Sequence, residues 1–342
     1  MKWNEVLIDL RKRLYVYVAA AMVLASTVGM KYSFSRHALR VIGWLSVFIM
    51  LYPMLTGLAV ERVVSAVKRP WLIGLALTYA FIIASLTAYL VSHTILEGYP
   101  ELAFALAMVG AIPCSNMLIG WTGIAGASVE DALVVAVSGL LLTPLVSPIL
   151  LSIVGGVFIA FDSLNLGLLL LTYILVPLFL GFLTRRYLMR RLGGKGFVEV
   201  KKYLPGISAT GVLLIVFVAT ARVAKLVMSD PEILVLVVAG LFSYYIIQTL
   251  IALITIRVLK LSYEYAVILL LASVASSQAI SLSVAASMFP PLTVFALSMK
   301  PLLQVLYILF LIYTVAPLIA IWDRNLRVTG RQYERPIHNI IQ

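Results

Sequence analysis

The chain has 342 residues, of which 63% are hydrophobic and only 12% are charged, and its mean hydropathy is +1.08. A soluble domain carries about 25% charged residues, so this composition excludes a water-soluble protein and indicates one covered largely by lipid. The net charge of +12 does not indicate nucleic-acid binding, because the basic residues form short clusters between apolar runs, without interleaved aromatic residues. The single cysteine, Cys114, excludes an intramolecular disulfide and a multi-cysteine metal site.

Ten apolar runs are long enough to cross a membrane, which takes about 20 residues in a helix. They cover residues 14–30, 40–60, 70–93, 102–125, 131–154, 163–184, 205–224, 232–256, 264–288 and 291–321. The connection at 185–204, which is rich in basic residues, is predicted as the one long polar loop. The sequence therefore predicts an all-α integral membrane protein with ten transmembrane helices.

The distribution of lysine and arginine predicts the orientation. With the N-terminus inside the cell, 20 basic residues lie on the inner side, five lie on the outer side, and Lys300 lies within a span. Basic residues are enriched in cytoplasmic loops. We therefore expect a multi-pass protein of the cell membrane with both termini in the cytoplasm.

The basic segment separates five spans from five. An odd number of spans per half forces the halves into opposite orientations, so an internal repeat must be inverted, as in many secondary transporters. The weak echo of Leu142-Thr143-Pro144 in Met299-Lys300-Pro301 agrees with this arrangement. The predicted divisions are 1–160 for the first five-helix repeat, 161–204 for the sixth helix and basic loop, 205–323 for the rest of the second repeat, and 324–342 for a cytoplasmic tail.

Polar residues interrupt two of the spans, the fourth and the ninth. Backbone breaks at membrane depth occur where the chain lines a cavity or packs in protein, so we expect both helices to be broken and to cross there. The candidate solute-binding residues are Cys114, Ser115, Asn116, Ser273, Ser276, Ser277, Gln278 and Lys300, and the predicted helix-breaking residues are Pro113, Pro144 and Pro301. Half-helix N-termini at such a crossing favour an anionic or oxygen-rich ligand. The alternative is that the small residues only let helices pack closely.

Cys114 and Lys300 carry the most specific chemistry. A thiol beside a helix-breaking proline is a soft ligand for a thiophilic solute, whereas a lone buried cysteine can also be an inert small hydrophobe. Lys300 is an ionisable residue within a span, and such residues are costly and usually functional. The alternative for Lys300 is a side chain that extends to the membrane surface.

Sequence motifs for ATP hydrolysis or hydrolytic catalysis do not occur. The chain contains no G-x-x-x-x-G-K-[ST], no G-x-S-x-G and no H-E-x-x-H. A carrier driven by an ion or solute gradient is therefore a simpler interpretation than an ATP-driven transporter or an enzyme.

Several motifs resemble one transporter superfamily. Pro113-Cys114-x-x-Met117-x-x-x-Trp121 and Tyr52-Pro53-Met54-Leu55 resemble motifs of the arsenite-efflux permeases. The stretches 141–148 and 175–182 are similar to signatures of the bile acid:sodium symporter family. These are branches of the bile/arsenite/riboflavin transporter superfamily. The resemblance covers about residues 14–321, is closest to the arsenite branch in the N-terminal half, and implies two inverted five-helix repeats with broken, crossing fourth and ninth helices.

Departures from the family patterns concern the coupling ion. The resemblance implies a fourth-span cysteine and a ninth-span glutamate as key residues in the arsenite permeases. Cys114 matches the cysteine, but Ala279 occupies the position of the glutamate. Positions of sodium ligands in the symporters are occupied by Ala272 and Ser276, and Ala132 and Ala136 replace fifth-span hydroxyls.

Ser115 and Asn116 do match sodium-site positions, yet a full sodium site is not expected, nor is any cofactor. Lys300 instead would supply the positive charge of a bound cation, with protons as the coupling ion.

The leading hypothesis is therefore a secondary transporter of the arsenite-permease branch that exports arsenite or a similar small oxyacid. The second is a sodium- or proton-coupled carrier of organic anions, and the third is a membrane sensor derived from a transporter. The expected partners are a small-molecule solute and the lipid bilayer, without nucleic acid and without an obligatory protein partner.

Overall fold

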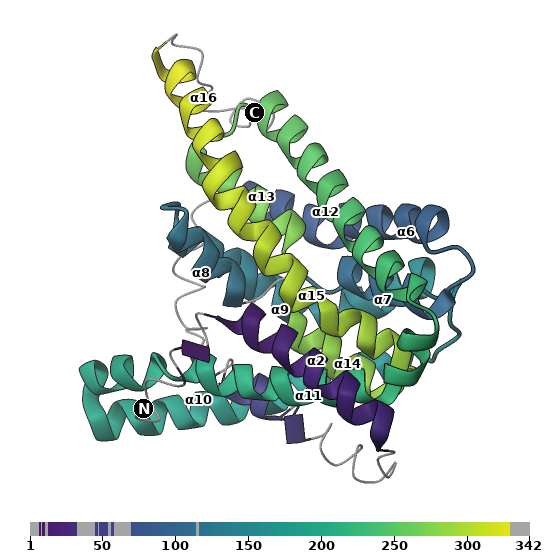
Figure 1. The fold of residues 1–342 in the computed structure, drawn as a ribbon. Helices are drawn as coiled ribbons and strands as arrows, with labels where there is room; N and C mark the ends of the chain where they lie inside the picture. Colours follow the sequence, from purple (N-terminus) through teal and green to yellow (C-terminus); the bar gives the residue numbers. More distant parts are fainter. Residues whose placement is uncertain are drawn as a thin grey trace.

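A computed structural model of the chain describes residues 7, 9–10, 13–32, 45–46, 48–53, 56–57, 70–113 and 116–328. These residues are almost entirely helical, and they contain no named strand (Figure 1). The helices are α2 (Leu14–Lys31), α5 (Pro70–Thr78), η1 (Tyr79–Ile83), α6 (Ala84–Ile95), α7 (Pro100–Ala111), α8 (Asn116–Ile124), α9 (Val129–Val154), α10 (Ser163–Lys201), α11 (Leu204–Ser229), α12 (Glu232–Val258), α13 (Tyr263–Val274), α14 (Gln278–Met288), α15 (Pro291–Phe310), η2 (Leu311–Val315) and α16 (Ala316–Val328).

Six helical rods in the described part are long and apolar enough to cross a membrane. They are Pro70–Ile95, Val129–Val154, Ser163–Lys201, Leu204–Ser229, Glu232–Val258 and Pro291–Asp323. The first and last of these rods each contain a short π-helical segment, η1 and η2. The prediction of an all-α membrane protein is thus confirmed, whereas much of the expected span at 40–60 lies outside the described residues.

The predicted polar loop at 185–204 is wrong, because most of it is helical: α10 extends to Lys201 as two helices joined by a kink at Gly193. This segment is rich in arginine, leucine and lysine, which favour helix, so the chain stays helical where its composition turns polar. The rod is bent at Gly193, whose φ of 68° is the left-handed conformation that glycine adopts readily. Helix α16 likewise continues to Val328, beyond the start of the predicted tail.

Two of the three prolines predicted to break helices do not do so. Pro144 lies inside the continuous helix α9, and Pro301 lies inside α15. A proline in a membrane helix is tolerated where neighbouring groups compensate for the lost hydrogen bond.

Close helix packing places the N-terminal span against the second half of the chain. Helices α2 and α11 approach so closely that a Cβ atom at Gly29 would lie 2.3 Å from the carbonyl oxygen of Ala221. Helix α15 packs against α2, α7, α11, α12 and α14. Residues of α15 are therefore surrounded by helices from both halves, and this is where the buried polar residues described below are found.

Candidate functional site

The chain breaks two helices, as the sequence predicts, and both breaks are short. Helix α7 ends at Ala111, Ile112 is extended (φ −112°, ψ 101°), and α8 begins at Asn116. Helix α13 ends at Val274, Ala275 is extended (φ −75°, ψ 132°), and α14 begins at Gln278. The second break is thus narrower than the predicted segment, since Ser273 remains helical.

The two breaks meet each other. Pro113 and Ser276 form an isolated antiparallel bridge between segments that are far apart in the sequence. The backbone N–H of Ser277 donates to the carbonyl of Pro113 at 3.2 Å and also approaches that of Ile112 at 3.4 Å. Backbone groups released by the missing helical turns are therefore partly satisfied across the crossing, which fixes the two breaks together.

Ser277 caps the half-helix that starts at the crossing. Its hydroxyl accepts a hydrogen bond from the backbone N–H of Ile280 at 3.4 Å, as expected for the residue before a helix. In the first turn, the hydroxyl of Ser281 donates to the carbonyl of Ser277 at 2.6 Å. The N-terminal end of α14, with its partial positive charge, therefore lies inside the protein at the crossing.

Two polar side chains at the crossing lack hydrogen-bond partners among the described residues. They are the hydroxyl of Ser276 and the amide of Gln278, whose oxygen and nitrogen are both without a partner. Ser276 is 3% exposed and Gln278 is 4% exposed, so bulk water does not supply the missing hydrogen bonds to these side chains. Buried polar groups are normally satisfied by protein, ligand or ordered water, so these atoms are available to a polar solute.

Lys300 lies at the same place and not at the membrane surface. Its side chain is 0% exposed, and its Nζ atom donates to the hydroxyl of Ser281 at 3.5 Å. This contact contradicts the alternative in which the lysine extends to the membrane surface. The ammonium group and the N-terminal end of α14 therefore place positive charge side by side, an arrangement that an anion stabilises.

Helix α9 forms the wall behind the break in α7. The hydroxyl of Ser147 donates at 2.6 Å to the carbonyl of Ala111, the last residue of α7. Gly139 faces the proline of the break, since a Cβ atom there would lie 3.5 Å from the Cγ atom of Pro113. Ser147 was not among the predicted site residues, although it lies in the stretch that resembles the symporter signature.

The remaining predicted site residues divide into two groups. Cys114 and Ser115 lie outside the described residues, and Asn116 is the first residue of α8 with its side chain outside them. Ser273 is buried in α13, where its hydroxyl donates to the carbonyl of Leu270 at 2.8 Å. The hydroxyl of Ser273 is therefore engaged by its own helix.

Metal ligands are scarce in the described part of the chain, where no group of three or more His, Cys, Asp or Glu side chains could hold an ion. Ala132, Ala136 and Ala272, at positions where the family resemblance implies sodium ligands, are buried and offer no side-chain oxygen. Ser276, at another of these positions, does carry a hydroxyl oxygen, so the three alanines reduce the set of side-chain ligands that a sodium ion could use.

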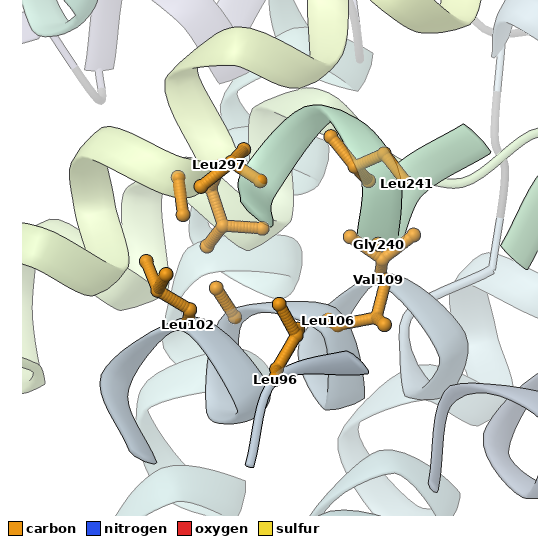
Figure 2. A pocket seen from close by; sticks show the side chains of 10 residues that line it. Leu96, Leu102, Leu106, Val109, Gly240, Leu241 and Leu297 are labelled. Carbon is orange, nitrogen blue, oxygen red and sulfur yellow. The ribbon is translucent and has the colours of Figure 1, made fainter. Parts of the chain in front are cut away.

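An apolar pocket lies apart from these polar groups, between α7, α12 and α15 (Figure 2). Its volume is about 20 Å³, which is close to the space that one water molecule needs. It is lined by Leu96, Leu102, Ala105, Leu106, Val109, Val237, Gly240, Leu241, Ala296 and Leu297. Neither its size nor its chemistry suits a polar solute.

Long apolar helices, broken helices that meet in the interior and a buried lysine together define a multi-pass membrane transporter. Comparison with known proteins agrees with this class. Residues 44–230 match the model of the Sodium Bile acid symporter family, and the chain belongs to this family. Members of the family are transporters, so the chain is a transporter and not an enzyme.

A characterised relative indicates the branch. The chain is 26% identical over 245 residues to the Arsenical-resistance protein Acr3 of Alkaliphilus metalliredigens (strain QYMF). This similarity covers 64% of the chain and 67% of the relative. The resemblance to the superfamily and to its arsenite-permease branch, inferred from sequence motifs, is thereby confirmed.

Proposed function

We propose that the chain is a secondary active transporter that exports arsenite or a similar small oxyacid across the plasma membrane. The observation that carries the proposal is the meeting of the two helix breaks at Pro113 and Ser276, beside the buried ammonium of Lys300. The similarity to an arsenical-resistance protein supports the choice of solute.

The proposed architecture has ten spans. To the six long rods we add α2, the partly described span near 40–60, and the broken pairs α7–α8 and α13–α14, each of which would cross as one unit. The first repeat would occupy residues 1–160, the sixth helix and basic segment 161–204, and the rest of the second repeat 205–323. The bias of basic residues supports cytoplasmic termini.

The solute would bind where the breaks cross. The free side-chain atoms of Ser276 and Gln278 would supply hydrogen bonds, and the positive end of α14 would attract negative charge or electron-rich oxygen. Cys114, Ser115, Asn116 and Ser277 complete the proposed site on sequence grounds, and Ser273 is left out because its hydroxyl donates to Leu270 in its own helix. Pro113 would keep α7 from continuing through the site.

Coupling to protons follows from Lys300. Its ammonium group is buried next to the proposed solute position, and Ala132, Ala136 and Ala272 remove side-chain ligands for sodium. The lysine would neutralise an anionic solute in one access state and release a proton in the other. A proton gradient, and not a sodium gradient, would then drive transport.

Arsenite resistance tests the solute assignment. A thiol is a far better ligand for As(III) than a hydroxyl, so Cys114→Ser should abolish the resistance that the wild type confers on an arsenite-sensitive host. Protein in the membrane is quantified for both. Resistance that is unchanged in Cys114→Ser would reject the role of the thiol, and a wild type that confers none would reject arsenite export.

A carrier of organic anions is the second candidate, and the match to a family described by bile acid and sodium symport favours it. Flux measured in reconstituted vesicles separates the candidates. Uptake of a labelled organic anion under a sodium gradient, without arsenite flux, would support the second one. Binding of a solute without any flux would indicate a sensor instead.

A further inference from the structure

A second group of buried polar atoms without partners lies on α12 and α15. The hydroxyl of Tyr245 and both amide atoms of Gln248 and Gln304 have no hydrogen-bond partner among the described residues. Tyr245 and Gln248 are 0% exposed and Gln304 is 1% exposed. These residues were not among the predicted site residues, and they are not part of the proposed solute site.

These atoms are connected to Lys300 along one face of α15. Lys300, Gln304 and Tyr307 are spaced by four and then three residues, so they lie on the same face of the helix. The hydroxyl of Tyr307 donates to the carbonyl of Tyr245 at 3.2 Å and lies 2.9 Å from the hydroxyl of Thr249. A polar stripe therefore runs from the buried lysine to α12.

Helices α12 and α15 run in the same direction. Leu241 of α12 lines the apolar pocket with Leu297 of α15, and further along both helices the rings of Tyr245 and Tyr307 lie 5.3 Å apart. In Figure 1, α12 and the extension of α15 into α16 lead toward the same end of the molecule. The stripe thus extends from Lys300 toward the membrane side on which both helices end.

Neutral hydrogen-bonding atoms line this stripe beyond Lys300. Donors and acceptors that are buried without protein partners are normally satisfied by ordered water, provided that several polar groups converge. A tyrosine hydroxyl and two amides offer both donors and acceptors, which is what ordered water requires. We propose that these residues hold a chain of ordered water molecules through which Lys300 exchanges protons with that side of the membrane.

Charged groups on the helices that pack against α15 lie elsewhere. Those of α2, α7, α11, α12 and α13 within the described residues are exposed or half-buried, and they are Lys31, Glu101, Arg222, Lys225, Glu232, Arg257 and Glu264. The buried titratable groups of α12 and α15 besides Lys300 are Tyr244, Tyr245 and Tyr307. Lys300 is therefore the residue of this stripe, among the described ones, that can carry an exchangeable proton as a cation.

The proton transfer conserves atoms and charge. An N–H bond of the Lys300 ammonium breaks and an O–H bond forms on the first water, which passes a proton to the next, and a neutral amine remains. The reverse sequence restores the ammonium group. This role rests on the proton coupling proposed above, whereas the presence of water in the stripe can be measured without transport.

Radiolytic labelling of the intact purified protein tests for the water. Hydroxyl radicals form from water that lies next to a side chain, so Tyr245 and Tyr307 should be oxidised several-fold faster than Phe104, which is 0% exposed like Tyr245 and packs against other aromatic rings. Gln304→Leu should slow the labelling of Tyr307, and Leu306→Ala, on the exposed side of the same helix, should not. Labelling of both tyrosines no faster than that of Phe104 would overturn the proposal.

Flux in vesicles tests the proton path. Under a proton gradient, Gln304→Leu should slow arsenite flux several-fold while equilibrium binding of arsenite is unchanged, and Tyr307→Phe provides a second variant if Gln304→Leu fails to fold. Flux that equals the wild type in both variants would overturn the path. A wild type without proton-driven flux would overturn the proposed coupling itself, and the labelling result would still decide whether the stripe is hydrated.

Discussion

Two buried regions border helix α15 and differ in chemistry. Near the start of the helix, Ala296 and Leu297 line a pocket whose other residues are also apolar. About one turn further along, Lys300 reaches Ser281 next to the crossing, where the amide of Gln278 has no partner among the described residues. The first region holds an empty space of about 20 Å³, and the second holds polar atoms that require a partner.

This difference indicates what each region contributes. Apolar side chains around a small void stabilise the fold through packing, and their replacement should change stability more than transport. Buried polar atoms without partners cost stability and are retained where a ligand or water binds them. The apolar pocket is therefore a poor guide to the solute site in this protein, and four predictions test the distinction.

The largest effect is expected from Lys300→Gln. Removing one member of a buried charge interaction with an anionic solute costs about 3 kcal/mol, which corresponds to about 100-fold in solute affinity. Thermal stability should be kept or increased, because a buried charge is removed. Solute binding and flux under separate proton and sodium gradients provide the measurement. Sodium-driven uptake that survives in Lys300→Gln would reject the proposed role.

Leu297→Ala should have the opposite effect, lowering stability while leaving transport nearly unchanged. Leu297 is 1% exposed and lines the apolar pocket, so its truncation enlarges an existing void and should lower the free energy of unfolding by about 2 kcal/mol. Flux per folded molecule should stay close to that of the wild type. Thermal unfolding in detergent and flux in vesicles are measured on the same preparation. A large loss of solute affinity with unchanged stability would show that the pocket takes part in binding.

Gln278→Ala should weaken solute binding about tenfold, the loss of roughly one hydrogen bond to a charged or strongly polar group. Stability should change little, because the amide has no partner among the described residues. Ser273→Ala is the matched control, since the hydroxyl of Ser273 already donates to Leu270 in its own helix. Equal losses of affinity in the two variants would contradict the assignment of Gln278 to the site.

Much of the fold could be predicted from hydropathy alone, because membrane thickness fixes the length of an apolar run. The prediction of a loop at 185–204 neglected helix propensity, because arginine and lysine favour helix even where the chain is too polar to lie in the membrane. Whether a proline breaks its helix could not be predicted, for a different reason. Pro113 lies at a break that another chain segment stabilises, whereas Pro144 and Pro301 lie in helices that continue, and sequence does not show which carbonyls find partners.

The candidate site could be predicted in part. Ser276, Ser277 and Lys300 were identified because polar residues are rare in apolar spans, and the structure places them beside Pro113 or Ser281. The crossing of the two breaks was expected from the polar interruptions at membrane depth and is also implied by the family resemblance. Gln304 was missed although it lies one helical turn after Lys300, a spacing that would have indicated a polar face of the span.

The smallest effect concerns a hydrogen bond between helices. The hydroxyl of Ser147 donates from α9 to the carbonyl of Ala111 at 2.6 Å, where α7 ends at the crossing. Ser283 provides a matched comparison, since its equally buried hydroxyl donates at 2.6 Å to Ala279 in its own helix. In each variant one serine hydroxyl is replaced by hydrogen, so the change in volume is the same.

Ser147→Ala should lower the free energy of unfolding by about 1 kcal/mol, because it leaves the last carbonyl of α7 without this donor. Ser283→Ala should cost less, because the carbonyl of Ala279 lies within a continuous helix that supplies other donors. Unfolding in detergent measures the difference, and solute affinity tests whether it reaches the site. If α9 holds the break of α7 in place, only Ser147→Ala should also weaken solute binding, by about two- to threefold. Equal stability and affinity in the two variants would mean that the break is held by its contact with Ser276 and Ser277 alone.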